Sequence, residues 1–241
     1  MAHPRICVAG IEAESRRHIR PTTGPANPLS RDLLADQGGP FEVGAVVELG
    51  ETTPTPNPPE VEDQRFEPAA TRQIGRLRPE KYLGLLDEVA QRSIRYGFGP
   101  DLEHRGRYKF ASETGRGERS LLCVRMEEFI ALGISDWGTL QLRFNVAHER
   151  AYAPVTDLRF YEADQRTIRE AVVEDVAARL RKRTRAWVMF GLSRPWAPPE
   201  EEIERHWLQV NGICLEDDPL GPPLAPPAPI RSQTPPRDCL F

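Results

Sequence analysis

The chain has 241 residues, enough for one large or two small folded domains with a good core. Its net charge of −4 and its pI near 5.8 argue against a protein that binds polyanions over its whole surface. A local basic groove is still compatible with these values. Four cysteines stand far apart without a CxxC pair, which argues against a zinc knuckle and a disulfide framework. We expect them to behave as small buried hydrophobic residues.

The hydropathy pattern bears on the location of the protein, and its choice of basic residues bears on the ligands that it suits. No apolar run approaches the roughly 18 residues of a membrane span, and the N-terminus lacks the apolar stretch of a signal peptide. We therefore expect a cytoplasmic protein with no membrane partner. Lys81, Lys109 and Lys182 are the only lysines, so arginine carries nearly all positive charge. Arginine suits bidentate phosphate contacts and stacking on bases, and a compositional habit of the source genome gives the same bias.

The first half alternates short strand patterns with turn residues. Strands are predicted over residues 5–11, 16–20 and 43–49. Ser30 is a candidate N-cap for a brief helix over residues 31–36, which Gly38 and the residues after it end. The proline- and threonine-rich residues 51–60 favour an extended surface connection. A longer helix is predicted from Pro79 to about Ser93.

The densest strand signal of the chain lies in residues 120–157. Residues 121–126 form an apolar strand pattern, and residues 139–146 alternate apolar with polar side chains at period two. Residues 151–157 resume extended structure after a short polar gap, which predicts a β-hairpin on a loop at residues 147–150. Pro154 cannot donate to a strand ladder and marks an edge or a bulge.

The last third begins with an amphipathic helix pattern over residues 167–182. Strands are then predicted over residues 186–192 and 206–215. Beyond Asp218 proline dominates, with too few apolar residues for independent folding. We expect this tail to be extended and to dock on a partner through Ile230 or through Leu240 and Phe241.

Several short phrases resemble the dual OB-containing domain family of prokaryotic proteins. They run in family order from residue 5 to residue 215: ICVAGIE, HIRPTTG, the strand at 44–49, SLLCVRM, the hairpin at 143–157, GLSRPW and HWLQVNGI. The resemblance implies two OB-like barrels in one module, and many members have a suspected role in defence or nucleic-acid sensing. His18 stands where the family usually has an aromatic residue. The helix at 167–182 looks like an insertion between strands of the last barrel.

The predicted fold is therefore mainly β with added helices (α+β). It consists of two OB-like small β-barrels, an inserted helix in the C-terminal half and a Pro-rich tail. Many short strands separated by turn residues are typical of closed or partly closed barrels. The expected units are residues 1–100 (first barrel with linker and helix), 101–218 (second barrel with the inserted helix) and 219–241 (tail).

An OB-type barrel binds oligonucleotides across one exposed face with stacked aromatic side chains and a basic groove. Two candidates have a second interpretation: Arg20 can instead form an ion pair with a nearby glutamate, and Trp137 can instead pack over a barrel end. The predicted nucleic-acid contacts are Arg16, Arg17, His18 and Arg20 from the first barrel, and Trp137, Arg143 and Tyr152 from the second.

Catalytic patterns are missing from the sequence. The five histidines are scattered singly, without a metal-binding spacing such as HExxH, and the acidic runs are of the solvated kind. We expect no catalytic residue, metal or cofactor. The leading hypothesis is a non-catalytic nucleic-acid-binding or sensing module, with single-stranded DNA or RNA and a protein effector as partners. The alternatives are an adaptor subunit that does not contact nucleic acid, and a cryptic enzyme or small-ligand sensor that uses the barrel mouth.

Overall fold

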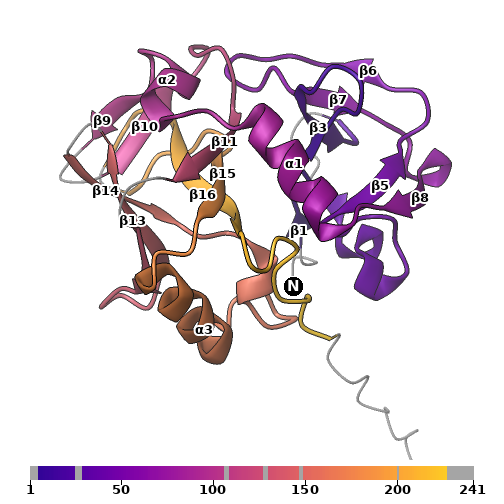
Figure 1. The fold of residues 1–241 in the computed structure, drawn as a ribbon. Helices are drawn as coiled ribbons and strands as arrows, with labels where there is room; N and C mark the ends of the chain where they lie inside the picture. The colour runs from indigo at the N-terminus through magenta and orange to yellow at the C-terminus, as the bar shows by residue number, and fades with distance from the viewer. Residues whose placement is uncertain are drawn as a thin grey trace, which may run out of the picture.

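The computed structural model describes residues 5–24, 29–105, 109–126, 130–146, 149–199 and 201–226. Figure 1 shows two β-rich halves side by side, the first in indigo and purple and the second in pink to yellow. The chain is mainly β with added helices, as the sequence predicted. The predicted partner contacts Ile230, Leu240 and Phe241 lie outside the described residues.

The first half is assembled from short strand pairs around a small core. Its strands are β1 (Arg5–Ile6), β2 (Gly10–Ile11), β3 (His18–Thr22), β4 (Leu29–Ser30), β5 (Ala45–Glu48), β6 (Thr53–Pro54), β7 (Asp63–Arg65) and β8 (Arg72–Arg76). They form a β2-β3-β7-β6 sheet and the pairs β1-β4 and β5-β8. The predicted strand over residues 5–11 is thus two short strands. Ile6, Leu29, Leu34, Phe41 and Phe66 form the core.

Helices of the first half follow the predicted signals with one addition. The brief helix after Ser30 is a pair of 3-10 helices, η1 (Arg31–Leu33) and η2 (Ala35–Gln37), and a third, η3 (Pro68–Ala70), follows β7. α1 (Pro79–Val89) begins at the predicted proline. The sequence did not predict α2 (Ile94–Phe98), because the glycines at its end are typical of a helix stop. Its N-cap Ser93 accepts a hydrogen bond from the Tyr96 amide.

The second half contains two sheets that share one core. Its strands are β9 (Glu103–Arg105), β10 (Lys109–Glu113), β11 (Leu121–Met126), β12 (Ala131–Ile134), β13 (Leu140–Val146), β14 (Glu149–Pro154), β15 (Ala186–Leu192) and β16 (Arg205–Leu215). They pair in the orders β11-β15-β16-β10-β9 and β12-β13-β14. A parallel bridge between Val155 and Val210 joins the end of the second sheet to β16. The arrangement is a partly closed barrel, and the predicted hairpin is β13-β14 with Pro154 on its edge strand.

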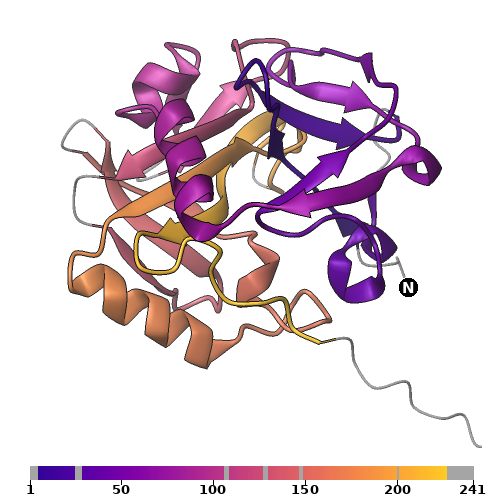
Figure 2. The ribbon, with the colours of Figure 1, turned by 45° about the vertical axis from the view of Figure 1, so that its right-hand side comes forward.

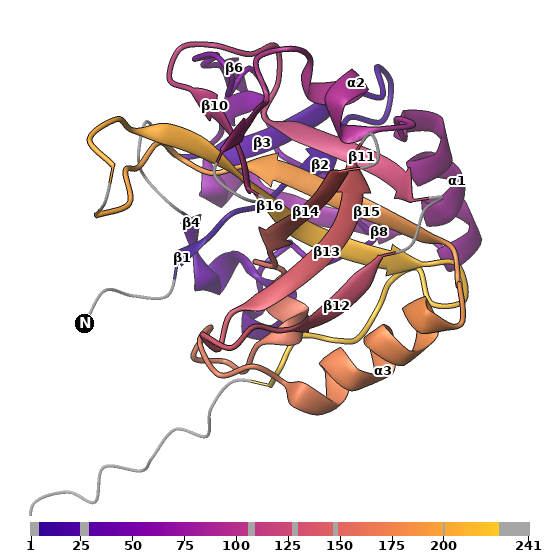
Figure 3. The ribbon, with the colours of Figure 1, turned by 90° about the vertical axis from the view of Figure 1, so that its left-hand side faces the viewer.

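The helix between β14 and β15 belongs to this barrel. After the 3-10 helix η4 (Leu158–Phe160), α3 (Glu170–Arg181) places Val173, Val176 and Leu180 in the same core as Leu142 and Val188. Figure 3 shows α3 lying along the open side of β12. The helix that resembled an insertion is therefore an integral part of the core.

Three cysteines lie in the described residues, and they have two different environments. Leu86 of α1 packs against Cys123, Trp187 and Cys214 on the outer side of the large sheet, which attaches the first half to the second. These two cysteines are buried as predicted. Cys7 is exposed, so the expectation of burial is corrected there: the short strands β1 and β2 leave its position uncovered.

The Pro-rich end of the chain does not start as a separate tail. Residues 216–226, here called the strap, follow β16 and lie against both halves. Arg159 donates a hydrogen bond to the Leu220 carbonyl at 2.6 Å, and Arg169 donates one to the Pro223 carbonyl at 2.7 Å. Leu224 packs on the core of the first half. Figure 2 shows the strap in yellow, passing α3 towards the first half.

Candidate nucleic-acid interface

The outward face of the β12-β13-β14 sheet presents the polar half of the period-two pattern. Leu142 and Phe144 point into the core, so Arg143 between them points outward and is exposed. The strand register places Arg143 opposite Ala131 on β12 and opposite Tyr152 on β14. This sheet faces the viewer in Figure 3. The structure thus brings two of the predicted contact residues together as cross-strand neighbours.

A shallow hollow of about 600 Å³ lies over this face. Ala131 is small, so Arg143 and Tyr152 border open space beside it. Arg150 pairs with Asn145 two residues further along the hairpin, and both are exposed. The described residues around the hollow include two arginines and no carboxylate: Ala131, Gln141, Arg143, Phe144, Asn145, Arg150, Ala151 and Tyr152. We call this surface the β13-β14 face. Its charges favour an anion, and its aromatic ring and amides suit a base.

Trp137 lies on the turn between β12 and β13 and is 92% exposed. The turn is held by the Ser135 side chain, which accepts a hydrogen bond from the Thr139 amide at 3.1 Å. Gly138 adopts a φ of +73°, which glycine tolerates best. A tryptophan presented in this way has most of its ring available for stacking. The alternative, packing over a barrel end, is not what the structure shows.

Comparison with known protein families agrees with this architecture. The profile of the dual OB-containing domain family matches residues 1–213. The chain belongs to this family. No curated protein and no solved structure matches the chain significantly. Among the helices that the structure describes, none has the length and apolar character needed to cross a membrane.

Arg20 lies in a different environment from Arg143. Its side chain is 4% exposed, and its Nε donates to Asp63 Oδ1 at 2.6 Å, while its Nη2 lies 3.7 Å from Glu60 Oε1. Arg194, from the connection between β15 and β16, pairs with Glu60 at 2.5 Å and with Asp63 at 2.8 Å. This placement corrects the expectation of a nucleic-acid contact at Arg20, because reaching a ligand would break a buried ion pair. It agrees with the ion-pair alternative.

The carboxylates of this cluster were missed from sequence. Glu60, Glu62 and Asp63 are all buried at the junction of the two barrels. Glu62 accepts hydrogen bonds from the Ser120 amide at 3.0 Å and from the Leu121 amide at 3.2 Å, which fixes the start of β11. Three acidic residues directly after a Pro-Pro pair resemble an ordinary solvated loop. A local pattern cannot show that arginines from distant segments cover them.

The remaining candidates of the first barrel do not join the β13-β14 face. Arg16 pairs with Glu88 of α1 at 2.5 Å, and Arg17 lies 3.4 Å from Glu12. His18 is half-buried, and burial together with the positive charge of Arg119 lowers its pKa from 6.5 to about 4. A neutral imidazole at physiological pH is a poor partner for phosphate. None of the three borders the hollow on the β13-β14 face: Arg16 and Arg17 are exposed and paired with acidic side chains of the first half, and His18 is half-buried.

Two further observations bear on chemistry in the described residues. Asp157 caps η4 by accepting a hydrogen bond from the Arg159 amide, and it forms a buried ion pair with Arg159 at 2.6 Å. Burial alone would lower the pKa of Arg159, but Asp157 outweighs it and raises that pKa. No group of three or more potential metal-ligating side chains occurs in the part of the chain that the structure describes.

Proposed function

We propose that the chain is a nucleic-acid-binding module that takes a single strand across the β13-β14 face. The observation that carries the proposal is the juxtaposition of Arg143, Arg150 and Tyr152 around a hollow whose described lining has no carboxylate. In OB-type barrels the face of the second and third strands and the loop between the first and second strands bind oligonucleotides.

The topology supports the same surface. β11 pairs with β15 and β12 pairs with β13, so the two segments together take the place of a long first strand. β13 and β14 are then the second and third strands, and the turn that carries Trp137 is the loop between the first and second. In the proposed complex Tyr152 and Trp137 stack on bases, while Arg143 and Arg150 contact phosphates.

The proposal includes a non-catalytic role beside a protein effector and a role in prokaryotic defence. Two observations support it: the sequence has no recognisable nuclease or ATPase motif, and the family resemblance points to sensing. An adaptor role without nucleic acid is the alternative, and the strap, which already joins both halves through Arg159 and Leu224, is the feature that favours it.

Fluorescence anisotropy with labelled single-stranded DNA, single-stranded RNA and duplexes tests the proposal. We expect binding of a single strand that weakens by about tenfold or more in Arg143→Ala. Arg72→Ala is the matched control, since Arg72 is also exposed on a strand but lies on β8 of the first half. No binding to any oligonucleotide at low salt would contradict the proposal and favour the adaptor role.

A further inference from the structure

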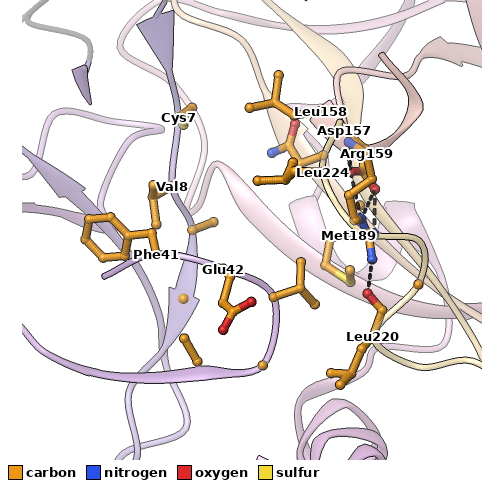
Figure 4. Close-up of a pocket in the computed structure, with 18 of the residues that line it drawn as sticks. Cys7, Val8, Phe41, Glu42, Asp157, Leu158, Arg159, Met189, Leu220 and Leu224 are labelled. Carbon is orange, nitrogen blue, oxygen red and sulfur yellow. Dashed lines mark hydrogen bonds and ion pairs between the residues drawn. The ribbon is translucent and has the colours of Figure 1, made fainter. Parts of the chain in front are cut away.

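A cleft of about 1850 Å³ runs between the two barrels, away from the residues that form the β13-β14 hollow. Figure 4 shows its walls: the segments around Val8 and Phe41 of the first half on one side, and η4, β15 and the strap on the other. Most labelled side chains are apolar, and they come from both halves: Val8, Phe41, Leu158, Met189, Leu220 and Leu224. Junctions of domains are common places for small-molecule sites, and apolar walls with a few polar groups are typical of them.

Glu42 is the polar group at the centre of this view. Its carboxylate points into the space between the apolar walls (Figure 4). Arg76 donates a hydrogen bond to Glu42 Oε1 at 2.8 Å, which balances the negative charge. A carboxylate that is already charge-balanced favours a neutral donor on a ligand over a second cation. The walls favour an apolar body on the same ligand.

We propose that the cleft between the barrels binds a small, largely apolar molecule that carries a neutral N–H or O–H donor, with Glu42 as the acceptor. The site goes beyond the nucleic-acid face, because it uses other residues and another ligand chemistry. Because the strap supplies Leu220 and Leu224 to one wall, an occupied cleft also ties the strap to the first barrel.

Cys7 provides a reporter inside the cleft. It is exposed and lines the cleft, whereas Cys123 and Cys214 are buried at 0% exposure. The residue is exposed, but the groups packed around its sulfur desolvate the thiol and raise its pKa. Its reaction is therefore slow, and an equilibrium measurement is preferable to a rate. In a Cys239→Ser background the Cys7 thiolate attacks a disulfide-linked fragment, forms a mixed disulfide and releases the other half as a thiolate.

The first arm compares a naphthyl fragment with a hydroxyethyl fragment at a fixed concentration of 2-mercaptoethanol, read by intact mass and peptide mapping. We expect the naphthyl fragment to be retained on Cys7 about tenfold better. Ala9→Trp, at an exposed position that lines the cleft two residues from Cys7, should occupy the space beside Cys7 and reduce the difference. Equal retention of both fragments in the parent, or an unchanged preference in Ala9→Trp, would overturn the proposal.

The second arm tests the donor. A naphthyl amide with a free N–H should be retained better than its N-methylated form, and Glu42→Ala should remove that preference while leaving the naphthyl preference in place. Glu42 and Arg76 form a partly exposed pair, so folding is expected to survive the change. Retention that ignores N-methylation in the parent would overturn the assignment of Glu42. Circular dichroism of each variant excludes unfolding as the cause.

Discussion

Arg20 and Arg143 both lie on β-strands of barrel-like halves, yet they have opposite environments. Arg20 is 4% exposed and has the carboxylates of Asp63 and Glu60 beside it. Arg143 is exposed and has Tyr152 opposite it, with Arg150 beside the same hollow. A buried charge requires partners of opposite sign, whereas an exposed charge is left available for a ligand. The role of an arginine is therefore decided by the side chains that segments distant in the sequence place beside it.

The largest effect is expected at the buried cluster. Asp63→Ala removes a shared partner of Arg20 and Arg194, and the free energy of unfolding should fall by about 3 to 5 kcal/mol because a buried charge loses its partner. Glu48→Ala, which breaks the exposed pair with Arg72, should cost no more than about 1 kcal/mol. Urea unfolding measures both. A similar small loss in the two variants would show that the cluster does not hold the barrels together.

The second prediction concerns pH. In the folded chain the pKa of His18 is lowered to about 4 from 6.5, so between these values the unfolded chain binds more protons. Stability from this residue is present above about pH 6.5 and is lost as the pH falls towards 4, by about 2 to 3 kcal/mol. His18→Phe should reduce the loss of stability between pH 7 and pH 4 by that amount. Parallel pH profiles of parent and variant would contradict the buried neutral imidazole.

A third change sharpens the exposed side of the comparison. Trp137→Ala should weaken single-strand binding by about 1 to 2 kcal/mol, since one stacking contact is lost, with little change in unfolding free energy. Trp196→Ala is a control at another exposed tryptophan, on the connection between β15 and β16. Anisotropy titrations compare the two. Equal weakening would mean that the binding surface extends well past the β13-β14 face.

The smallest effect is expected at Arg16. Its pair with Glu88 is about half exposed on both sides, so Arg16→Ala should change the free energy of unfolding by less than about 1 kcal/mol. Oligonucleotide affinity should stay within about twofold, because Arg16 lies outside the β13-β14 face. A tenfold loss of affinity in the same anisotropy assay would return the first barrel to the binding site.

Sequence patterns predicted the second half better than the first, for physical reasons. The alternation around Arg143 and the apolar stripe of α3 are local, so hairpin and helix followed from period and turn residues alone. The burial of Arg20 depends on Glu60 and Asp63, about forty residues away, and no local period reports such a pairing. The packing of the strap is likewise set by contacts with both halves. Long-range polar contacts were therefore the missing information.

The central claim is that the β13-β14 face, and not the buried arginine cluster, contacts nucleic acid. The most direct test is the salt dependence of single-strand binding for the parent and for the Arg143→Ala/Arg150→Ala double variant. Each lost phosphate contact makes the negative slope of log K against log salt shallower by about 0.7. The account predicts a slope smaller by about 1.4 in the double variant. An unchanged slope with intact folding would contradict it.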